Sequence, residues 1–249
     1  MQNQGTWTPS KFVYRNGALR ATRDEREVGL GSRLAAELVA SLYDAHLARY
    51  ARGRLVDLGC GKVPLFAAYR DHVSTVTCVD WEGTSHTNDW VDVYCDLAGD
   101  LPFEDGSFDT ILLSDVLEHI PRPEHLWEEM SRILSPGGHL IMNVPFLYWL
   151  HEEPHDYYRY TEFALRRFVE SAGMELRLLR AIGGTPEVLA DILAKHVVRV
   201  PVVGRLIASA VQAGTLGLVR TRLGKRASQR TAAKLPLGYF LIASKPETP

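Results

Sequence analysis

The sequence has few cysteines, no long apolar run and no strong excess of charge. Cys60, Cys78 and Cys95 are scattered, and two of them stand in apolar runs, which argues against a disulfide framework. A net charge of −2 argues against a dedicated nucleic-acid-binding protein. No uncharged apolar run reaches the roughly 18 to 20 residues of a bilayer-spanning helix. The start, Met1 to Gly5, lacks the features of a secretory signal, so we expect a cytoplasmic protein.

The composition is that of an ordinary globular protein, with 46% hydrophobic and 23% charged residues in 249. This length suits one α/β domain with an appendage. We expect an N-terminal arm and helix (1–50), a core (51–182), a helical insertion (183–236), and a last strand with a tail (237–249). The first 30 residues are polar and mixed, and we expect them to pack loosely.

Short apolar runs alternate with helical stretches through the core. Five runs are Arg54 to Leu58, Thr75 to Val79, Val91 to Cys95, Thr110 to Leu113, and His139 to Val144. Two more strands are expected at Glu175 to Ile182 and Gly238 to Ser244. Helices are expected from Leu34 to Tyr50 and from an N-cap at Thr161 to Ala172. The alternation predicts βαβ units and a parallel sheet covered on both faces.

Two glycines and an acid mark the turn after the first predicted strand. Gly59 and Gly61 follow Asp57, and glycine lets the backbone pass close to a ligand, while free amides at a helix start suit an anion. A dinucleotide fingerprint needs a third glycine where this chain has Pro64, and a P-loop needs Ser or Thr at the position of Val63. Both rival motifs fail on their own terms.

Carboxylates recur at the ends of the predicted strands. Asp80 closes the second run and Asp96 follows the third, just as Asp57 lies at the end of the first. Ligands of open α/β sheets bind beyond the carboxyl ends of the strands, so we expect these acids to converge on one crevice. Each alone would pass for a polar residue ending a strand, but three in succession favour a binding site.

These segments resemble the ordered motifs of class I S-adenosylmethionine-dependent methyltransferases, of the type 11 kind. The resemblance covers about residues 54 to 182 and is carried by Val56 to Gly61, Cys78 to Asp80, Asp96-Leu97, Leu101 to Phe103, Ser107 to Asp109, Asp115 to His119, and Leu134 to Gly138. It implies a Rossmann-like sheet of seven strands, parallel except for an antiparallel last strand, with helices on both faces. A helical insertion would precede that last strand.

The resemblance also implies S-adenosylmethionine as the cofactor and assigns roles around it. The methionine end would be surrounded by Asp57, Gly59, Cys60 and Gly61, the adenosine by Asp80, Trp81, Asp96 and Leu97, and the sulfonium by Ser114 and Asp115. A carboxylate-rich site suits a cationic sulfonium and would repel a pyrophosphate. One departure is Val63, where the family often has a third glycine.

The densest cluster of functional groups is the stretch from His151 to Tyr160, which should lie over the cofactor. His155 next to Asp156 is the first candidate for a general base, and His151 is the second. Acceptor contacts are expected from Tyr157, Tyr158, Arg159 and His119. An equally good alternative is a polar loop that shapes the pocket without moving protons. A metal held by His151, Glu152, His155 and Asp156 is conceivable by residue type, but their irregular spacing argues against it, and no metal is expected.

The insertion is apolar and basic at once. No acidic residue occurs between Asp191 and Glu247, while basic residues run through 195–234. Such helices suit a peripheral contact with an anionic membrane, a cap packed on the core, or a homodimer interface. The cap is favoured, and either a cap or a membrane contact would form a lid or wall near the acceptor.

Three functions follow as hypotheses. The first is methyl transfer to an oxygen, or failing that a nitrogen or carbon, of a sugar, polyketide, quinone or lipid-linked intermediate. The second is an NAD-dependent oxidoreductase on a Rossmann sheet, which Pro64 opposes. The third is a non-catalytic scaffold that keeps the cofactor pocket. A cofactor-binding screen separates the first two.

Overall fold

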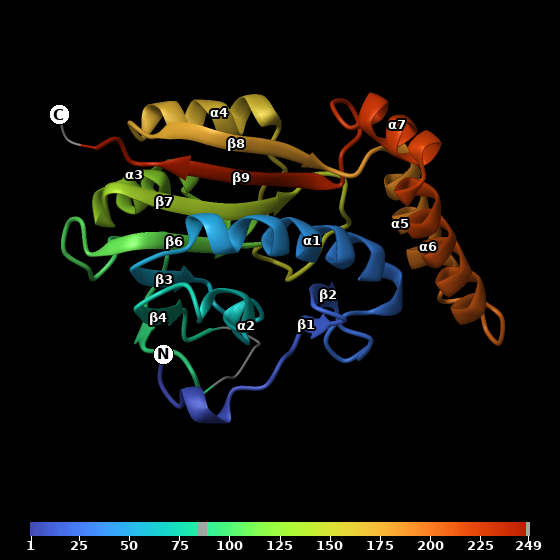
Figure 1. Cartoon of the computed structure of the whole chain (residues 1–249), viewed down its shortest axis with the longest axis horizontal. Helices are drawn as coiled ribbons and strands as arrows, with labels where there is room; N and C mark the ends of the chain where they lie inside the picture. Colours follow the sequence, from blue (N-terminus) through green and yellow to red (C-terminus); the bar gives the residue numbers. More distant parts are fainter. Residues whose placement is uncertain (84–88, 248–249) are drawn as a thin grey trace.

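A computed structural model describes residues 1–83 and 89–247, and its centre is one twisted sheet of seven strands in the order β5-β4-β3-β6-β7-β9-β8 (Figure 1). The strands are β3 (Arg54–Leu58), β4 (Thr75–Asp80), β5 (Val93–Tyr94), β6 (Phe108–Ser114), β7 (Leu134–Pro145), β8 (Glu175–Ile182) and β9 (Gly238–Ser244). Only β9 runs antiparallel to its neighbours β7 and β8. This confirms the predicted sheet, including its antiparallel last strand.

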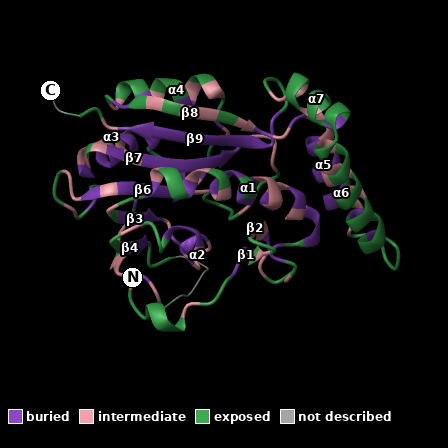
Figure 2. Ribbon diagram, in the orientation of Figure 1, coloured by how far each residue is buried: buried purple, intermediate pink, exposed green. Residues whose placement is uncertain are grey.

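The sheet is covered on both faces, as the alternation of apolar runs predicted. Leu112 and Ile141 belong to one buried cluster, whereas their neighbours Ile111 and Leu140 belong to another. Successive strand residues point to opposite faces, so the two clusters are the two sides of the sheet. Figure 2 shows the central strands buried along their length.

Four helices provide these two layers. They are α1 (Arg33–Tyr50), α2 (Phe66–Tyr69), α3 (Pro123–Ile133) and α4 (Glu162–Ser171). The first two pack on one face and the last two on the other. At the start of α4 the Thr161 hydroxyl accepts a hydrogen bond from the amide of Ala164, which confirms the predicted N-cap.

Strand β5 is shorter than the run from Val91 to Cys95 predicted. The carboxylate of Asp92 accepts a hydrogen bond from the Cys78 amide, at 2.7 Å, where a continuing strand would offer a backbone carbonyl. The amide of Asp92 in turn donates to the Cys78 carbonyl. A side chain therefore replaces the backbone ladder at this edge.

The N-terminal arm packs more tightly than expected. Strands β1 (Phe12–Arg15) and β2 (Ala18–Ala21) form a hairpin whose turn, Asn16-Gly17, has positive φ at both residues. Phe12 and Leu19 enter the core. The apolar pattern around Asn-Gly is a hairpin signal that could have corrected the expectation of a loose arm.

The insertion forms three helices beside the carboxyl ends of the strands (Figure 1). They are α5 (Thr185–Val197), α6 (Gly204–Arg220) and α7 (Arg222–Thr231). Gln212 on α6 donates a hydrogen bond to the Leu30 carbonyl in the short 3-10 helix η2 (Leu30–Ser32) and accepts one from the Leu34 amide at the start of α1. Among the described residues, no helix combines the length and the apolar character needed to cross a bilayer.

Candidate cofactor and acceptor site

A large cavity of about 840 Å³ opens at the carboxyl edge of the sheet. This edge lies where the chain passes from the β3-β4-β5 side to the β6-β7 side, the switch point at which open α/β sheets bind ligands. The structure brings ten of the sequence-predicted site residues to the wall: Gly59, Cys60, Gly61, Asp80, Trp81, Asp96, Leu97, Ser114, Asp115 and His119. His151, His155 and Tyr157, from the loop after β7, also line the cavity.

The glycine loop has the backbone path that such a site requires. Gly59 has a φ of 68°, and a Cβ there would lie 2.6 Å from the side chain of Val116, so no larger residue fits. Val63 also has a positive φ, of 48°. This left-handed conformation costs a non-glycine residue roughly 1–2 kcal/mol. The loop therefore keeps a left-handed turn at this position although the residue is a valine.

Asp57 lies behind the wall rather than in it. Its buried carboxylate accepts a hydrogen bond from the Tyr69 hydroxyl at 3.1 Å. Burial raises the pKa of Asp57 to about 8, against the opposing Tyr69 hydrogen bond and with help from the charge of Asp80. The predicted convergence of three acids on the cavity thus holds for Asp80 and Asp96, which line it, while Asp57 supports the loop from within.

Asp80 is fixed by the loop that it faces. Its two carboxylate oxygens accept hydrogen bonds from the amides of Gly61 and Trp81, both at 2.9 Å. Trp81 is 42% exposed and presents its ring to the cavity, where it meets the ring of His155 edge to face at 5.3 Å. Asp96 is exposed and caps the next turn through the Ala98 amide.

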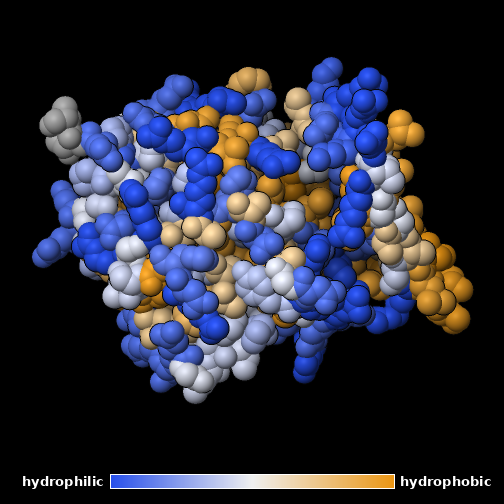
Figure 3. All heavy atoms as spheres, in the orientation of Figure 1, coloured by the Kyte–Doolittle hydropathy of each residue, from blue (hydrophilic) through white to orange (hydrophobic). Residues whose placement is uncertain are grey.

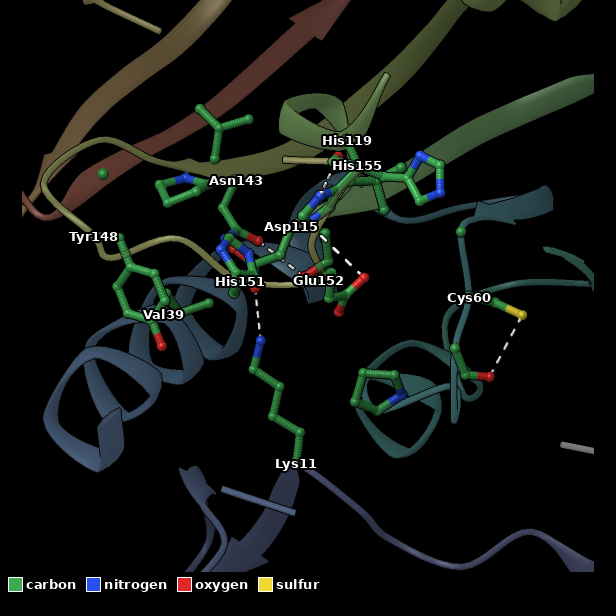
Figure 4. Close-up of a pocket in the computed structure, with 18 of the residues that line it drawn as sticks. Lys11, Val39, Cys60, Asp115, His119, Asn143, Tyr148, His151, Glu152 and His155 are labelled. Atoms are coloured by element: carbon green, nitrogen blue, oxygen red, sulfur yellow. Dashed lines mark hydrogen bonds and ion pairs between the residues drawn. The ribbon is translucent and has the colours of Figure 1, made fainter. Parts of the chain in front are cut away.

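Two residues that the sequence did not single out complete this wall. Lys11, from the arm, forms an ion pair of 2.6 Å with Asp115, and Figure 4 shows it rising from the arm toward that group. Burial would lower the pKa of Lys11, but the Asp115 carboxylate outweighs it and the pKa is raised. Asn143, at the end of β7, donates to Asp115 and accepts from Ser114 at 2.9 Å. Its place at a strand end was a usable signal, whereas nothing in the sequence marked Lys11.

The loop after β7 corrects one predicted pairing. Asp156 does not orient His155; Arg159 donates two hydrogen bonds to it, one of 2.7 Å, and it lies 3.3 Å from Nδ1 of His151. The Arg159 hydrogen bonds lower the pKa of Asp156 to about 2. The partner of His155 is instead the hydroxyl of Tyr157, 3.0 Å from its Nδ1. Adjacent side chains of the loop point in different directions, so sequence neighbours do not pair.

The remaining predicted acceptor contacts divide in two. Tyr157 lines the cavity, whereas the Tyr158 hydroxyl donates to the carbonyl of Pro121 at 3.2 Å and Arg159 is engaged by Asp156. Tyr158 and Arg159 therefore hold the loop in place and stand outside the cavity wall. Neighbouring amides at 157 and 158 also donate to the Glu118 carbonyl, which ties this loop to the end of β6.

The insertion does not wall the cavity. Among the described lining residues, none lies in 183–236, although Ile182 and Leu237 flank the insertion at the rim. Residues of the arm and η2 line the cavity instead, including Lys11, Glu27 and Ser32. Gln212 holds the insertion against η2, which explains why it stands beside the cavity.

Comparison with known proteins agrees with this geometry. Residues 56–142 match the family of methyltransferase domains. An uncharacterized methyltransferase of Mycobacterium tuberculosis is 38% identical over 78 residues, covering 29% of this chain and 30% of the relative. One from Mycobacterium avium is 46% identical over 50 residues, covering 20% and 19%. The chain thus matches less than a third of the length of these curated relatives.

Solved structures with the same fold cover most of the chain. A methyltransferase from Mesorhizobium loti that depends on S-adenosylmethionine has a TM-score of 0.53 at 16% identity, with 85% of this chain and 99% of that one covered. A Haloferax volcanii protein in complex with the Trm112 methyltransferase activator has a TM-score of 0.55 at 22% identity, with 90% and 95% covered. The cyclase SpnF has a TM-score of 0.54 at 21% identity, with 87% and 84% covered. At these identities the likeness concerns the fold alone.

The fold is the Rossmann-like sheet of solved S-adenosylmethionine-dependent methyltransferases, and residues 56–142 are similar to a methyltransferase domain. The family match does not favour the oxidoreductase alternative.

Proposed function

We propose that the chain transfers the methyl group of S-adenosylmethionine to an oxygen of a small-molecule acceptor, such as a sugar, a polyketide, a quinone or a lipid-linked intermediate. A nitrogen or a carbon is the second choice for the attacking atom. The observation that carries this proposal is one cavity lined by two unlike sets of residues: glycines and carboxylates from the strand ends between 59 and 115, and imidazoles and a phenol from η3 and the loop after β7.

The first wall suits the cofactor. Gly59 and Gly61 line the cavity and present backbone without side chains to the methionine end of the cofactor. Asp80, already turned toward the cavity by two amides, would accept the ribose hydroxyls. Trp81 offers a flat apolar surface to the adenine, and Asp96 would accept from its amino group.

The second wall suits the acceptor. The cofactor supplies an activated methyl group on a cationic sulfur, so the protein must align the acceptor and, for a hydroxyl, remove its proton. We assign proton acceptance to His155: with Nδ1–H donating to Tyr157, Nε2 becomes the accepting nitrogen. His151, held between Glu118 and Asp156, is less free to do so.

Turnover tests this assignment. Formation of S-adenosylhomocysteine is measured with a panel of hydroxylated acceptors, for the wild type and for His155→Gln. We expect the variant to bind the cofactor with unchanged affinity and to lose at least about tenfold in kcat. Unchanged turnover in the variant would remove His155 as the base. Cofactor binding without turnover on any acceptor would favour the scaffold alternative.

The insertion suggests where the acceptor comes from. Its outer side exposes large apolar side chains, among them Val202 at 94% and Leu206 at 73%, and Figure 3 shows this apolar surface where α5 joins the start of α6. Arg199 and Arg205 stand in the same stretch, and acids are absent from 192–246. We propose a peripheral contact with an anionic lipid surface that would bring a lipid-linked acceptor near the cavity, with a homodimer through the same face as the alternative.

A further inference from the structure

Three side chains with metal-binding groups meet beside the acceptor wall. Glu118 and His119 come from the 3-10 helix η3 (Leu117–His119), and His151 comes from the loop after β7. Oε1 of Glu118 lies 3.7 Å from Nε2 of His119 and 3.7 Å from Nε2 of His151. One ligand atom from each residue lies within 4.8 Å of the others. Around a tetrahedral metal ion with bonds of about 2.0–2.1 Å, neighbouring ligand atoms are roughly 3.3 Å from each other. Small rotations of these three side chains would therefore bring their ligand atoms to the distances that such an ion requires.

Glu118 carries the strongest indication of a missing ligand. Its side chain is 0% exposed, and none of the described groups donates a hydrogen bond to either carboxylate oxygen. Burying a carboxylate without hydrogen-bond donors costs free energy, and native proteins rarely contain such a group. Burial raises the pKa of Glu118 above its ordinary range, with the His151 imidazole acting in the opposite direction. A cation between Glu118 and the two imidazoles would satisfy these oxygens.

His119 is oriented as metal-ligating histidines usually are, whereas His151 has a carboxylate near the same ring nitrogen. Nδ1 of His119 is 2.9 Å from the carbonyl of His155, and Nδ1 of His151 lies 3.3 Å from the Asp156 carboxylate without a hydrogen bond to it. Arg159 in turn fixes Asp156. In His119 the acceptor at Nδ1 places the ring proton there and leaves the Nε2 lone pair free to coordinate. In both rings Nε2 is the nitrogen that faces Glu118.

We propose that Glu118, His119 and His151 bind one divalent transition-metal ion. Zn²⁺ is the ion chosen to test this site. Two imidazoles and one carboxylate suit such ions, whereas Mg²⁺ and Ca²⁺ prefer oxygen ligands. His119 and His151 also line the cavity, so the remaining coordination position of the ion faces the acceptor side. Figure 4 shows both rings beside Asp115 and Asn143 at this wall.

This site differs from the one that the sequence argued against. That set took all its ligands from one short loop, whereas this one joins His151 to two residues that lie more than thirty positions earlier in the chain. The competing explanation is a plain ion pair between Glu118 and protonated His151. Burial alone would lower the pKa of His151, but Glu118 and Asp156 outweigh it and raise the pKa. An ion pair needs no metal, so direct binding decides.

Zn²⁺ titration of the full chain, freed of metal by chelation, tests the site. Calorimetry should give one ion per chain, and Mg²⁺ should give no comparable binding. Glu118→Gln and His151→Ala should each weaken Zn²⁺ binding at least about tenfold, a conservative bound for the loss of one ligand. His125→Ala is the matched control, because His125 also faces carboxylates, Asp100 at 3.0 Å and Glu128 at 3.9 Å, and should bind as the wild type does. No binding to the wild type, or equal affinity in His151→Ala, would overturn the proposal.

Two further measurements keep the proposal testable if Glu118→Gln or His151→Ala fails to fold. Asp156→Asn leaves all three ligands in place and should weaken Zn²⁺ binding by about 10–100-fold, as the loss of an outer partner does. Co²⁺ in place of Zn²⁺ should give visible absorption bands that His151→Ala lacks; identical spectra would count against the site. Neither readout uses cofactor or acceptor, so the metal site can fail while the proposed methyl transfer stands, and the reverse.

Discussion

The two walls of the cavity are built in different ways. The cofactor wall comes mainly from one continuous stretch, from Gly59 to Asp115, in which each strand delivers its last residues to the same edge. The acceptor wall is assembled from η3 and the loop after β7, which are held together by contacts such as the Tyr157 amide to the Glu118 carbonyl. A wall made by strand ends can be anticipated from sequence spacing, whereas a wall made by contacts between distant loops cannot.

The largest effect is expected at Asp57, behind the cofactor wall. Its pKa of about 8 in the folded chain lies above the value near 3.8 of an unfolded aspartate, so the folded state holds the extra proton. The stability that this proton confers is complete below pH 3.8 and is lost as pH rises through 8. Between pH 5 and 8 the free energy of unfolding of the wild type should fall by about 3.5 kcal/mol relative to that of Asp57→Asn.

Urea unfolding at both pH values checks this difference. Asp100→Asn, an exposed acid outside the cavity, serves as the control and should track the wild type. A constant gap between the wild type and Asp57→Asn would show that Asp57 is ionised in the fold throughout this range.

The next effect concerns the support of the acceptor wall. Lys195 on α5 is buried with Asp191 at 2.6 Å, and its ammonium lies 3.4 Å from the ring centre of Tyr148, which lines the cavity. Lys195→Ala leaves Asp191 buried without its partner and should lower the free energy of unfolding by about 3 kcal/mol. Cofactor affinity of the folded variant should stay within twofold, because this contact lies on the other wall.

Chemical denaturation measures the stability of Lys195→Ala, and two further variants help to interpret the result. Lys234→Ala removes an exposed lysine of the same insertion and should change little. The pair Asp191→Leu with Lys195→Met removes both charges and should regain most of the lost stability. A Lys195→Ala chain as stable as the wild type would mean that the ion pair contributes nothing there.

Asp80→Ala tests the cofactor wall itself. The change removes the acceptor for the Gly61 and Trp81 amides and for the ribose hydroxyls, so affinity for S-adenosylhomocysteine should fall at least about 100-fold, or about 2.7 kcal/mol. Calorimetry gives the value, with Asp100→Ala as the control. Near-normal affinity in Asp80→Ala would place the ribose elsewhere.

The smallest effect is expected on the outer face of the insertion. Val202→Ser with Leu206→Ser should weaken binding to vesicles that contain anionic lipid by about tenfold, through lost apolar burial. Phe163→Ser, which changes an equally exposed apolar residue on α4, is the control. Co-sedimentation with the vesicles measures the binding of each variant. If the double variant and the Phe163→Ser control both bind vesicles as the wild type does, and the native chain is a dimer in solution, this face is a dimer interface instead.

The sequence predicted the sheet because its central strands are buried on both sides and therefore stand out as apolar runs. β3, β8 and β9 have the predicted bounds, and the glycine turn with Asp80 lies where spacing placed it. It could not predict Lys11, whose role depends on the path of the hairpin, nor the pairing of Asp156 with His151 across four intervening residues. Strand geometry is local and regular, whereas these contacts depend on how loops fold back.

Calorimetric titration of the metal-free chain with S-adenosylhomocysteine, beside a parallel titration with NAD, tests the central claim most directly. The account predicts one molecule of S-adenosylhomocysteine bound per chain, with at least about 100-fold loss in Asp80→Ala, and no binding of NAD. Heat from NAD alone, or none from S-adenosylhomocysteine at saturating concentration, would contradict it.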